Sequence, residues 1–278
     1  MKNWLKDEYV VLSGASRGIG RELAMLLICR YGAKVIGIGR KEDKILSLQS
    51  ELGEKAAGFS YRLFDVSDKD AWFALKTELA AAGIRPSLLI NNAGMFPTFC
   101  KTLDTPIETV EQITRVNYFS IAYAVSALKD VLKEKGGIVN VSSSAALCSV
   151  VGTSAYSASK AAVKGYTEAL ALEERGKLYI GLIHPGTTAT ELFDADENVK
   201  ESMLQKIAMK PEKMAAKIAR AVVKRKRRKV LGWDAKMMNF LAKVAPVRGI
   251  GIVANVMKAS KSKVFTNVFD YEKKGEKK

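Results

Sequence analysis

The chain has 278 residues, of which 48% are hydrophobic and 27% charged, with 21 glycines and only 6 prolines. This composition excludes a disordered chain, a collagen-like fibre and a small disulfide scaffold, and the length is sufficient for one large α/β core. The three cysteines, Cys29, Cys100 and Cys148, show neither CxxC nor Cys/His ligand spacing. We therefore expect no disulfide framework, no metal site and a reducing, cytoplasmic setting.

The formal net charge of +16 arises near one end of the chain. Residues 1–199 contain 23 basic and 23 acidic side chains, whereas residues 200–278 contain 22 basic and 6 acidic side chains. The excess of lysine and arginine in the second segment needs an explanation of its own.

Over the first two thirds of the chain, short apolar segments alternate with segments of helical periodicity. The predicted elements are strand 9–12, helix 22–31, strand 34–38, helix 42–52, strand 59–64, helix 68–82, strand 88–90, helix 107–135, strand 137–141, helix 155–175 and strand 178–183. Mostly apolar, mostly uncharged strands separated by helices are typical of a parallel sheet covered on both faces, with right-handed crossovers. The pattern predicts a doubly wound α/β fold of the Rossmann type.

The pattern changes after the last of these strands. The predicted elements there are a helix that begins at Pro211, the basic segment 224–229, a short strand at 230–231 and two amphipathic helices, 235–245 and 247–259. We expect one α/β domain over residues 1–231 and a basic, helical C-terminal extension over residues 232–278.

Three glycines, Gly14, Gly18 and Gly20, form a GxxxGxG turn between the first predicted strand and the first helix. Glycines let the backbone turn tightly and bring its N–H groups close to a phosphate, and a helix N-terminus favours negative charge. A glycine-rich turn is also a common connection with no ligand. Its position in the first strand-to-helix turn of a parallel sheet favours a dinucleotide-binding loop.

The segment after the second predicted strand indicates which dinucleotide is bound. An NAD site uses a carboxylate there to hold the ribose 2′-hydroxyl, whereas arginine holds a 2′-phosphate. Here Arg40 and Lys41 follow the strand, no carboxylate precedes Glu42, and Arg17 in the glycine turn supplies a second guanidinium. The alternative is that Arg40 and Lys41 are solvated residues at a helix start. The two arginines favour NADP(H) over NAD(H).

Tyr156 and Lys160 are four residues apart, so they share one face of a predicted helix. A tyrosine with its reference pKa of about 10 is a weak base at neutral pH, and a neighbouring cation lowers that pKa. The phenol can then exchange a proton with an alcohol or ketone oxygen while hydride moves to or from a nicotinamide. Ser143, just after strand 137–141, can hydrogen-bond the same oxygen. The combination, downstream of a dinucleotide loop, indicates an oxidoreductase.

These residues belong to five motifs that together resemble the short-chain dehydrogenase/reductase family. Across residues 7–231 they occur in the family's order as Gly14-xxx-Gly18-x-Gly20, Asn91-Asn92-Ala93-Gly94, Asn117, Ser143 with Tyr156-xxx-Lys160, and Pro185-Gly186-xxx-Thr190. The resemblance implies a Rossmann sheet of about seven strands and a catalytic tetrad. In this tetrad Tyr156 is the acid/base, Ser143 orients the carbonyl, Lys160 tunes Tyr156 and binds the nicotinamide ribose, and Asn117 holds a water that relays protons.

The resemblance also implies a set of cofactor contacts. Asp65 and Val66 are expected beside the adenine, and Thr188 and Thr190 near the carboxamide. The predicted cofactor-binding residues are Gly14, Ser16, Arg17, Gly18, Ile19, Gly20, Arg40, Asp65, Val66, Asn92, Ala93, Gly94, Tyr156, Lys160, Pro185, Gly186, Thr188 and Thr190.

The substrate side is predicted to be apolar. The family resemblance implies a lid at about 187–209. This segment combines apolar with acidic side chains, namely Leu192, Phe193, Met203, Leu204, Ile207 and Met209 with Glu191, Asp194, Asp196 and Glu197. Phe96, Phe99 and Cys100 form a second candidate wall, and residues 147–151 a third. Such a lining favours a bulky ketone or alcohol, with a steroid, a long acyl chain or an aromatic ketone all compatible, although some of these side chains could be core residues.

The basic extension allows several interpretations. It could bind an anionic membrane surface through residues 224–263, attract an acidic carrier protein, or contact nucleic acid without specificity, although stacking aromatics are sparse. It could also be a solvated face with a contact in a homo-oligomer, a dimer or tetramer. We expect no specific nucleic-acid partner and a cytoplasmic protein, with a peripheral membrane location as an option.

The sequence as a whole predicts an NADP(H)-dependent oxidoreductase that interconverts a ketone or aldehyde and an alcohol on a bulky hydrophobic substrate. One alternative is a 3-oxoacyl reductase whose basic extension attracts a carrier protein or coenzyme A. An alternative of another class is a non-catalytic NADP-binding scaffold or sensor that acts through the extension.

Overall fold

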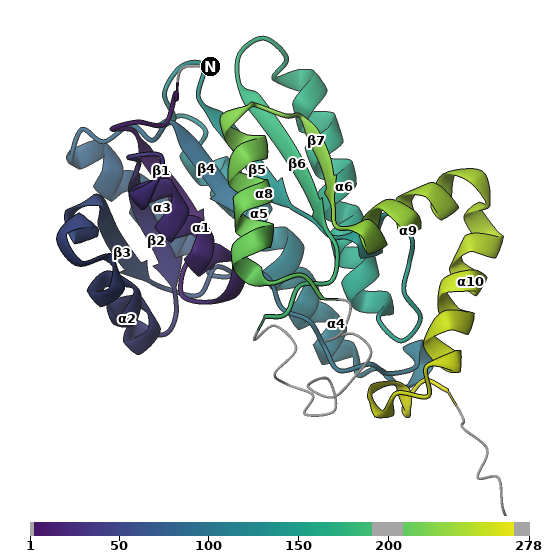
Figure 1. Ribbon diagram of the computed structural model, residues 1–278. Coiled ribbons are helices and arrows are strands. Elements are labelled where there is room, and N and C mark those ends of the chain that lie inside the picture. Colours follow the sequence, from purple (N-terminus) through teal and green to yellow (C-terminus); the bar gives the residue numbers. More distant parts are fainter. Residues whose placement is uncertain (1–2, 191–207, 270–278) are drawn as a thin grey trace, which may run out of the picture.

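A computed structural model describes residues 3–190 and 208–269, and its centre is a seven-stranded parallel sheet (Figure 1). The strands are β1 (Tyr9–Ser13), β2 (Lys34–Gly39), β3 (Phe59–Leu63), β4 (Leu88–Asn91), β5 (Gly137–Val141), β6 (Tyr179–Pro185) and β7 (Arg228–Leu231). Their order in the sheet is β3-β2-β1-β4-β5-β6-β7, which confirms the predicted fold class. The order reverses between β1 and β4, and doubly wound folds bind ligands outside the carboxyl ends of the strands at such a point.

Helices cover both faces of the sheet. One face packs against α1 (Gly18–Cys29), α2 (Glu42–Leu52) and α8 (Pro211–Val223), and the other against α3 (Lys69–Ala81), α5 (Ser120–Leu128) and α6 (Ser154–Glu173). Because both faces are covered, the central strands are mostly apolar: Val10, Val11 and Leu12 have no exposed surface.

The long helix predicted over 107–135 is interrupted, so that prediction was wrong. It consists of α4 (Ile107–Thr114), a π-helical turn (Arg115–Phe119) and α5, which ends at Leu128. Neither glycine nor proline occurs in this stretch, so no sequence signal marks the break. Single π-helical turns are frequent at functional sites, and this one contains Asn117.

The C-terminal extension folds against the α/β domain. After β7 the chain forms α9 (Trp233–Val244), α10 (Pro246–Ala259) and a 3-10 turn (Lys263–Phe265). Met257 and the 3-10 turn pack with Phe99, from the segment after β4, in a small core of their own. Among the described residues, no helix has the length and apolar character needed to cross a membrane.

The basic segment 224–229 and the pair α9–α10 lie at opposite ends of β7, because the segment leads into the strand and α9 follows it. Arg225 of this segment is used within the fold. Its guanidinium carbon lies 4.0 Å from the ring centre of Trp4, and its Nη2 donates to the carbonyl oxygen of Lys135 at 2.9 Å. The membrane surface predicted over residues 224–263 stays a prediction.

Candidate active site

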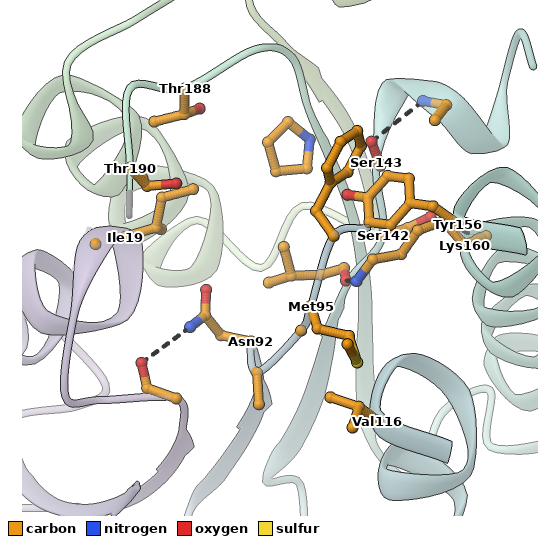
Figure 2. Close-up of a pocket in the computed structure, with 18 of the residues that line it drawn as sticks. Ile19, Asn92, Met95, Val116, Ser142, Ser143, Tyr156, Lys160, Thr188 and Thr190 are labelled. Atoms are coloured by element: carbon orange, nitrogen blue, oxygen red, sulfur yellow. Dashed lines mark hydrogen bonds between the residues drawn. The ribbon is translucent and has the colours of Figure 1, made fainter. Parts of the chain in front are cut away.

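A cavity of about 620 Å³ opens at the carboxyl ends of the strands. All of the residues predicted to contact the cofactor line it, although they come from segments between residues 14 and 190. Figure 2 shows Tyr156 and Lys160 on one side of this cavity and Ile19 and Thr190 on the other. The parallel sheet brings these segments together, because each one follows the carboxyl end of a strand.

Backbone geometry explains the glycines of the first turn. Gly14 and Gly18 have φ angles of 70° and 53°, in the region that favours glycine. A Cβ at Gly14 would lie 2.9 Å from the Cα of Ala93, and a Cβ at Gly20 would overlap the carbonyl oxygen of Gly14. Because Gly14, Gly18 and Gly20 have no side chains, a ligand can approach the backbone of this turn closely at the N-terminus of α1. This arrangement fits the pyrophosphate of a dinucleotide.

Arg40 and Asp65 form an ion pair along the same cavity, with 3.0 Å between Nη1 and Oδ2. Burial of Asp65 opposes its charge, but hydrogen bonds from the backbone N–H and hydroxyl of Ser67, together with Arg40, outweigh this and lower the pKa of Asp65. The Arg40 side chain is 66% exposed, so the pair adds little stability. Its guanidinium can therefore turn toward a ligand phosphate at small cost.

Tyr156, Ser143 and Lys160 gather at another part of the cavity. The helix α6 carries Tyr156 and Lys160 one turn apart, and Ser143 follows β5. Burial raises the pKa of Tyr156, and a hydrogen bond with Ser143 offsets part of this rise. Burial also lowers the pKa of Lys160 to about 8. The Lys160 Nζ donates to the carbonyl oxygen of Val141 at 3.1 Å.

The lowering of the Tyr156 pKa that we expected from Lys160 is not found in the structure. Burial dominates both groups, and the ring of Phe96 packs edge-on against Tyr156 with 4.8 Å between centres. The Lys160 Nζ lies 5.9 Å from the centre of the Tyr156 ring and is hydrogen-bonded elsewhere. The phenol therefore holds its proton more tightly than a free tyrosine does.

Asn117 lies one layer behind the cavity, fully buried in the π-helical turn. Its Oδ1 accepts from the N–H of Met95 at 2.8 Å, and its Nδ2 donates to the Met95 carbonyl and to the Ser159 Oγ, both at 3.0 Å. Met95 lines the cavity, so Asn117 ties the cavity lining to α6. The other three members of the predicted tetrad line the cavity directly.

His184, the only histidine of the chain, supports Ser143 from β6. Its Nδ1 lies 3.1 Å from the carbonyl oxygen of Ser143, and burial lowers the pKa of His184 to about 4. The ring is therefore neutral at pH 7, and Nδ1 carries the proton that the carbonyl accepts. The sequence held no signal for this role, because the two residues are 41 positions apart.

The C-terminal helices supply a wall of the cavity that sequence reasoning missed. The residues that line it from this segment are Trp233, Asp234, Met237, Met238, Val253, Val256, Met257 and Phe265. From the walls that were predicted, Phe96, Phe99 and Val150 line the cavity, and Cys100 does not. Amphipathic spacing was the only signal in the extension, and it does not identify what an apolar face packs against.

Asp234 connects this wall to the loop after β6. Its Oδ2 accepts from the N–H of Thr187 at 2.6 Å, and the residue is buried at the start of α9. The carboxylate fills the space that a Cβ at Gly186 or Gly232 would need. Gly232 also has a φ of 108°, so both its backbone conformation and the lack of space for a Cβ require glycine there.

Most of the predicted lid over 187–209, including its residues 191–207, lies outside the described residues. Its two ends pair with each other: the N–H of Ala189 donates to the Met209 carbonyl at 3.0 Å, and the N–H of Met209 donates to the Thr187 carbonyl at 2.9 Å. These bonds bring the ends of the segment together beside Thr188, which lines the cavity.

Comparisons with known proteins agree with this geometry. A family model described as short chain dehydrogenase matches residues 8–201. A 3-ketodihydrosphingosine reductase of Bos taurus is 29% identical over 260 residues, 88% of this chain and 78% of that protein. An acetoacetyl-CoA reductase of an Acinetobacter species is 31% identical over 234 residues, 78% of this chain and 90% of that protein.

Solved structures agree as well. A short chain dehydrogenase of Shigella flexneri, solved in complex with NADP, has a TM-score of 0.74 and 26% identity, and the match covers 85% of this chain and all of that one. The family match includes the glycine turn and the helix that carries Tyr156 and Lys160. The chain therefore belongs to the short-chain dehydrogenase/reductase family of oxidoreductases.

Proposed function

We propose that the protein is an NADP(H)-dependent oxidoreductase that interconverts a ketone or aldehyde and an alcohol on a bulky hydrophobic substrate. The observation that carries this proposal is one cavity shared by the glycine turn, by Ser143, Tyr156 and Lys160, and by an apolar wall. The nicotinamide, when bound, supplies or accepts the hydride. The chain's own residues bind the substrate, orient it and move the proton.

Two guanidiniums support a preference for NADP(H). Arg17 and Arg40 both line the cavity, and the residue directly after β2 is Arg40 rather than an acid. A ribose 2′-phosphate would form charge-assisted hydrogen bonds with these groups. The Shigella flexneri relative solved with NADP is consistent with this choice.

Tyr156 is assigned the proton transfer. Because burial raises its pKa, the phenol is protonated at neutral pH and can donate to a carbonyl oxygen in the reductive direction. Ser143 hydrogen-bonds the same oxygen, and a charged Lys160 stabilises the phenolate that remains and binds the nicotinamide ribose. The Asn117 side chain positions Met95 and α6, and both of its N–H donors are used there. The role of Asn117 in holding a water that relays protons stays a prediction.

The apolar wall supports a bulky substrate. Methionine and aromatic side chains of α9, α10 and the 3-10 turn give the cavity an adaptable surface suited to a steroid-like, long-chain acyl or aromatic group. The bovine relative is named as a reductase of a keto compound. A 3-oxoacyl-CoA or carrier-protein reductase is the second candidate, because the Acinetobacter relative is named an acetoacetyl-CoA reductase. The homo-oligomer and the cytoplasmic setting stay predictions.

Replacement of Tyr156 by phenylalanine tests the proposal. Tyr156→Phe removes only the hydroxyl, so turnover should fall about 10²- to 10⁴-fold while NADPH binding is retained. Turnover is followed by NADPH oxidation with steroid, acyl and aromatic ketones, with NADH in parallel, and binding by the fluorescence of NADPH. A wild-type protein that binds NADPH but turns over none of these substrates, or a variant with full activity, would support a scaffold or sensor instead.

A further inference from the structure

Exposed apolar side chains are concentrated on α9 and α10. Of the fourteen large hydrophobic side chains that are exposed among the described residues, eight lie in this helix pair. They are Trp233, Met237, Phe240, Val244, Val247, Ile250, Ile252 and Val256. The other six are spread over residues 46–172. A contiguous exposed apolar patch on a folded protein marks an interaction surface.

The exposed residues of α9 form one stripe that begins at the cavity. Trp233, Met237, Phe240 and Val244 are spaced i, i+4, i+7 and i+11, whereas the buried Met238 lies on another face of the helix. Trp233 and Met237 also line the cavity. The stripe therefore leads from the cavity to the end of α9, about 16 Å along the helix axis.

The turn between α9 and α10 is exposed and apolar, with a cation on each side. Val247 is 84% exposed, and Val244 is 59% exposed. Lys243 and Arg248 flank them, and both are exposed. In Figure 1 this turn lies at the outer edge of the molecule, on the right, away from the sheet. An apolar tip with flanking cations is suited to the boundary between lipid headgroups and acyl chains.

The positive charge of this surface favours an anionic partner. Residues 233–269 contain six basic side chains, Lys236, Lys243, Arg248, Lys258, Lys261 and Lys263, and one acidic side chain, the buried Asp234. A second copy of the same face would bring like charges together, which opposes a symmetric contact. An anionic lipid surface offers both the opposite charge and an apolar layer.

We propose that the α9–α10 pair docks on an anionic phospholipid bilayer, with the turn around Val247 inserted among the headgroups. The α9 stripe then connects the bilayer to the cavity, so that an apolar substrate reaches the site from the membrane. Delivery of the substrate from the membrane rests on the proposed oxidoreductase function, whereas the docking itself does not.

Vesicle binding by the full chain tests the docking. The protein is sedimented or floated with phosphatidylcholine vesicles containing about 30% phosphatidylserine, and with pure phosphatidylcholine vesicles. We expect binding to the anionic vesicles that weakens when salt is raised from about 0.1 M to about 1 M, because the Debye length falls from about 10 to 3 Å. Two double variants, Phe240→Ser/Val247→Ser and Lys243→Glu/Arg248→Glu, should each bind at least about tenfold more weakly.

Matched controls change exposed apolar or basic residues elsewhere. Leu103→Ser/Leu172→Ser replaces two exposed leucines, and Lys213→Glu/Lys217→Glu reverses two exposed charges on α8. Both controls should bind like the wild type. Absence of binding to anionic vesicles, or equal losses in the α9–α10 and control variants, would overturn the proposal. A dimer that the α9–α10 variants convert to monomer would identify a second copy as the partner instead.

Turnover separates this proposal from the enzyme assignment. None of the four residues changed in the α9–α10 variants lines the cavity, so activity on a water-soluble ketone should stay within about twofold of wild type. Activity on a ketone presented in anionic vesicles should fall about tenfold, in line with the weaker binding. If the α9–α10 variants lose activity on both the water-soluble and the vesicle-presented ketone, docking is not separate from catalysis. If they keep wild-type activity on both ketones, the substrate is not delivered through the membrane.

Discussion

Lys160 is 4% exposed, and none of the ion pairs found among the described residues includes it. The Lys160 Nζ donates a hydrogen bond to the Val141 carbonyl, a neutral partner. A lysine in such a place is unfavourable for folding, because the charged form loses its hydration. The proposed mechanism requires that charge beside the phenol, so activity and stability make opposite demands at this residue.

Replacement of Lys160 by methionine should therefore stabilise the ligand-free fold. The native pKa of about 8 lies below the unfolded value of 10.5, so the unfolded state binds more protons between these pH values. The free energy of unfolding of the wild type thus rises with pH in this window, and below pH 8 the full cost, about 3 kcal/mol, is present. At pH 7 the free energy of unfolding of Lys160→Met should be about 1–3 kcal/mol higher than that of the wild type, once the loss of the hydrogen bond with Val141 is subtracted. The variant should also lose turnover.

Urea denaturation at pH 7 and near pH 10 measures this effect, and the gain should shrink at the higher pH. Lys164→Met, one turn along α6, is the matched control, because Lys164 is partly exposed and paired with Glu168 at 2.9 Å. A Lys160→Met protein less stable than wild type at pH 7, or a gain that does not change with pH, would contradict the argument.

Sequence reasoning worked best for residues whose partners are near in the chain. Tyr156 and Lys160 are a helical turn apart, and the three glycines share one turn, so helix periodicity and turn chemistry were sufficient to find them. The lowering of the Tyr156 pKa predicted from Lys160 was wrong, because burial outweighs it, and part of the packing around Tyr156 comes from Phe96, which is distant in sequence.

At the scale of elements, α9 is joined to the loop after β6 by one carboxylate. Asp234 receives the Thr187 N–H and packs against Gly186 and Gly232. Asp234→Ala would remove the acceptor of the half-buried Thr187 N–H and loosen the wall, with an expected loss of about 1–3 kcal/mol in the free energy of unfolding. Asp234→Asn retains an oxygen acceptor and should lose less.

Kinetics separate positioning by Asp234 from a general loss of stability. Because α9 forms one wall, the KM for a bulky ketone should rise more in Asp234→Ala than the KM for a small ketone, and Asp234→Asn should restore most of the difference. Equal changes in both KM values, with kcat reduced for both substrates, would show that the residue does not act through the wall.

Among the elements, the strands were predicted best and the π-helical turn was missed. The strand 137–141 and the helix 42–52 were predicted at their observed bounds, because apolar runs and helical spacing are local signals. The π-helical turn over Arg115–Phe119 coincides with hydrogen bonds from Asn117 to Met95 and Ser159. Those contacts join three separate segments, so periodicity within one helix could not show them.

For the molecule as a whole, binding of the correct dinucleotide should stabilise the entire fold. A ligand at about 100 times its Kd adds about 2.7 kcal/mol, which for a chain of this size raises Tm by about 5–10 °C. We expect this shift with NADPH and a smaller one with NADH at the same concentration. Arg40→Ser should reduce the NADPH shift and leave the NADH shift unchanged, as measured by differential scanning fluorimetry.

Arg30→Ser is the control for this measurement, because Arg30 is an exposed arginine at the end of α1 that does not line the cavity. It should leave both shifts as in the wild type. A larger shift with NADH than with NADPH would refute the assignment of Arg40 to a ribose phosphate.

The global arrangement also explains what the sequence could not reveal about the extension. Phe99 and Phe265 lie 4.9 Å apart between ring centres but are far apart in the chain. A hydrophobic pattern shows that a helix has a partner and does not identify it, so the extension was predicted as a separate basic segment.

The position of the α9–α10 wall after the last strand of the sheet has a consequence during protein synthesis. The ribosome releases β1 to β7 before it releases the helices that complete the substrate side. A nascent chain can thus assemble its nucleotide crevice while the pocket for the second reactant is still unfinished. Because this wall follows β7, it can also be exchanged between relatives without interrupting the order of the strands, which makes it a natural place for a shared reaction to acquire a new selectivity.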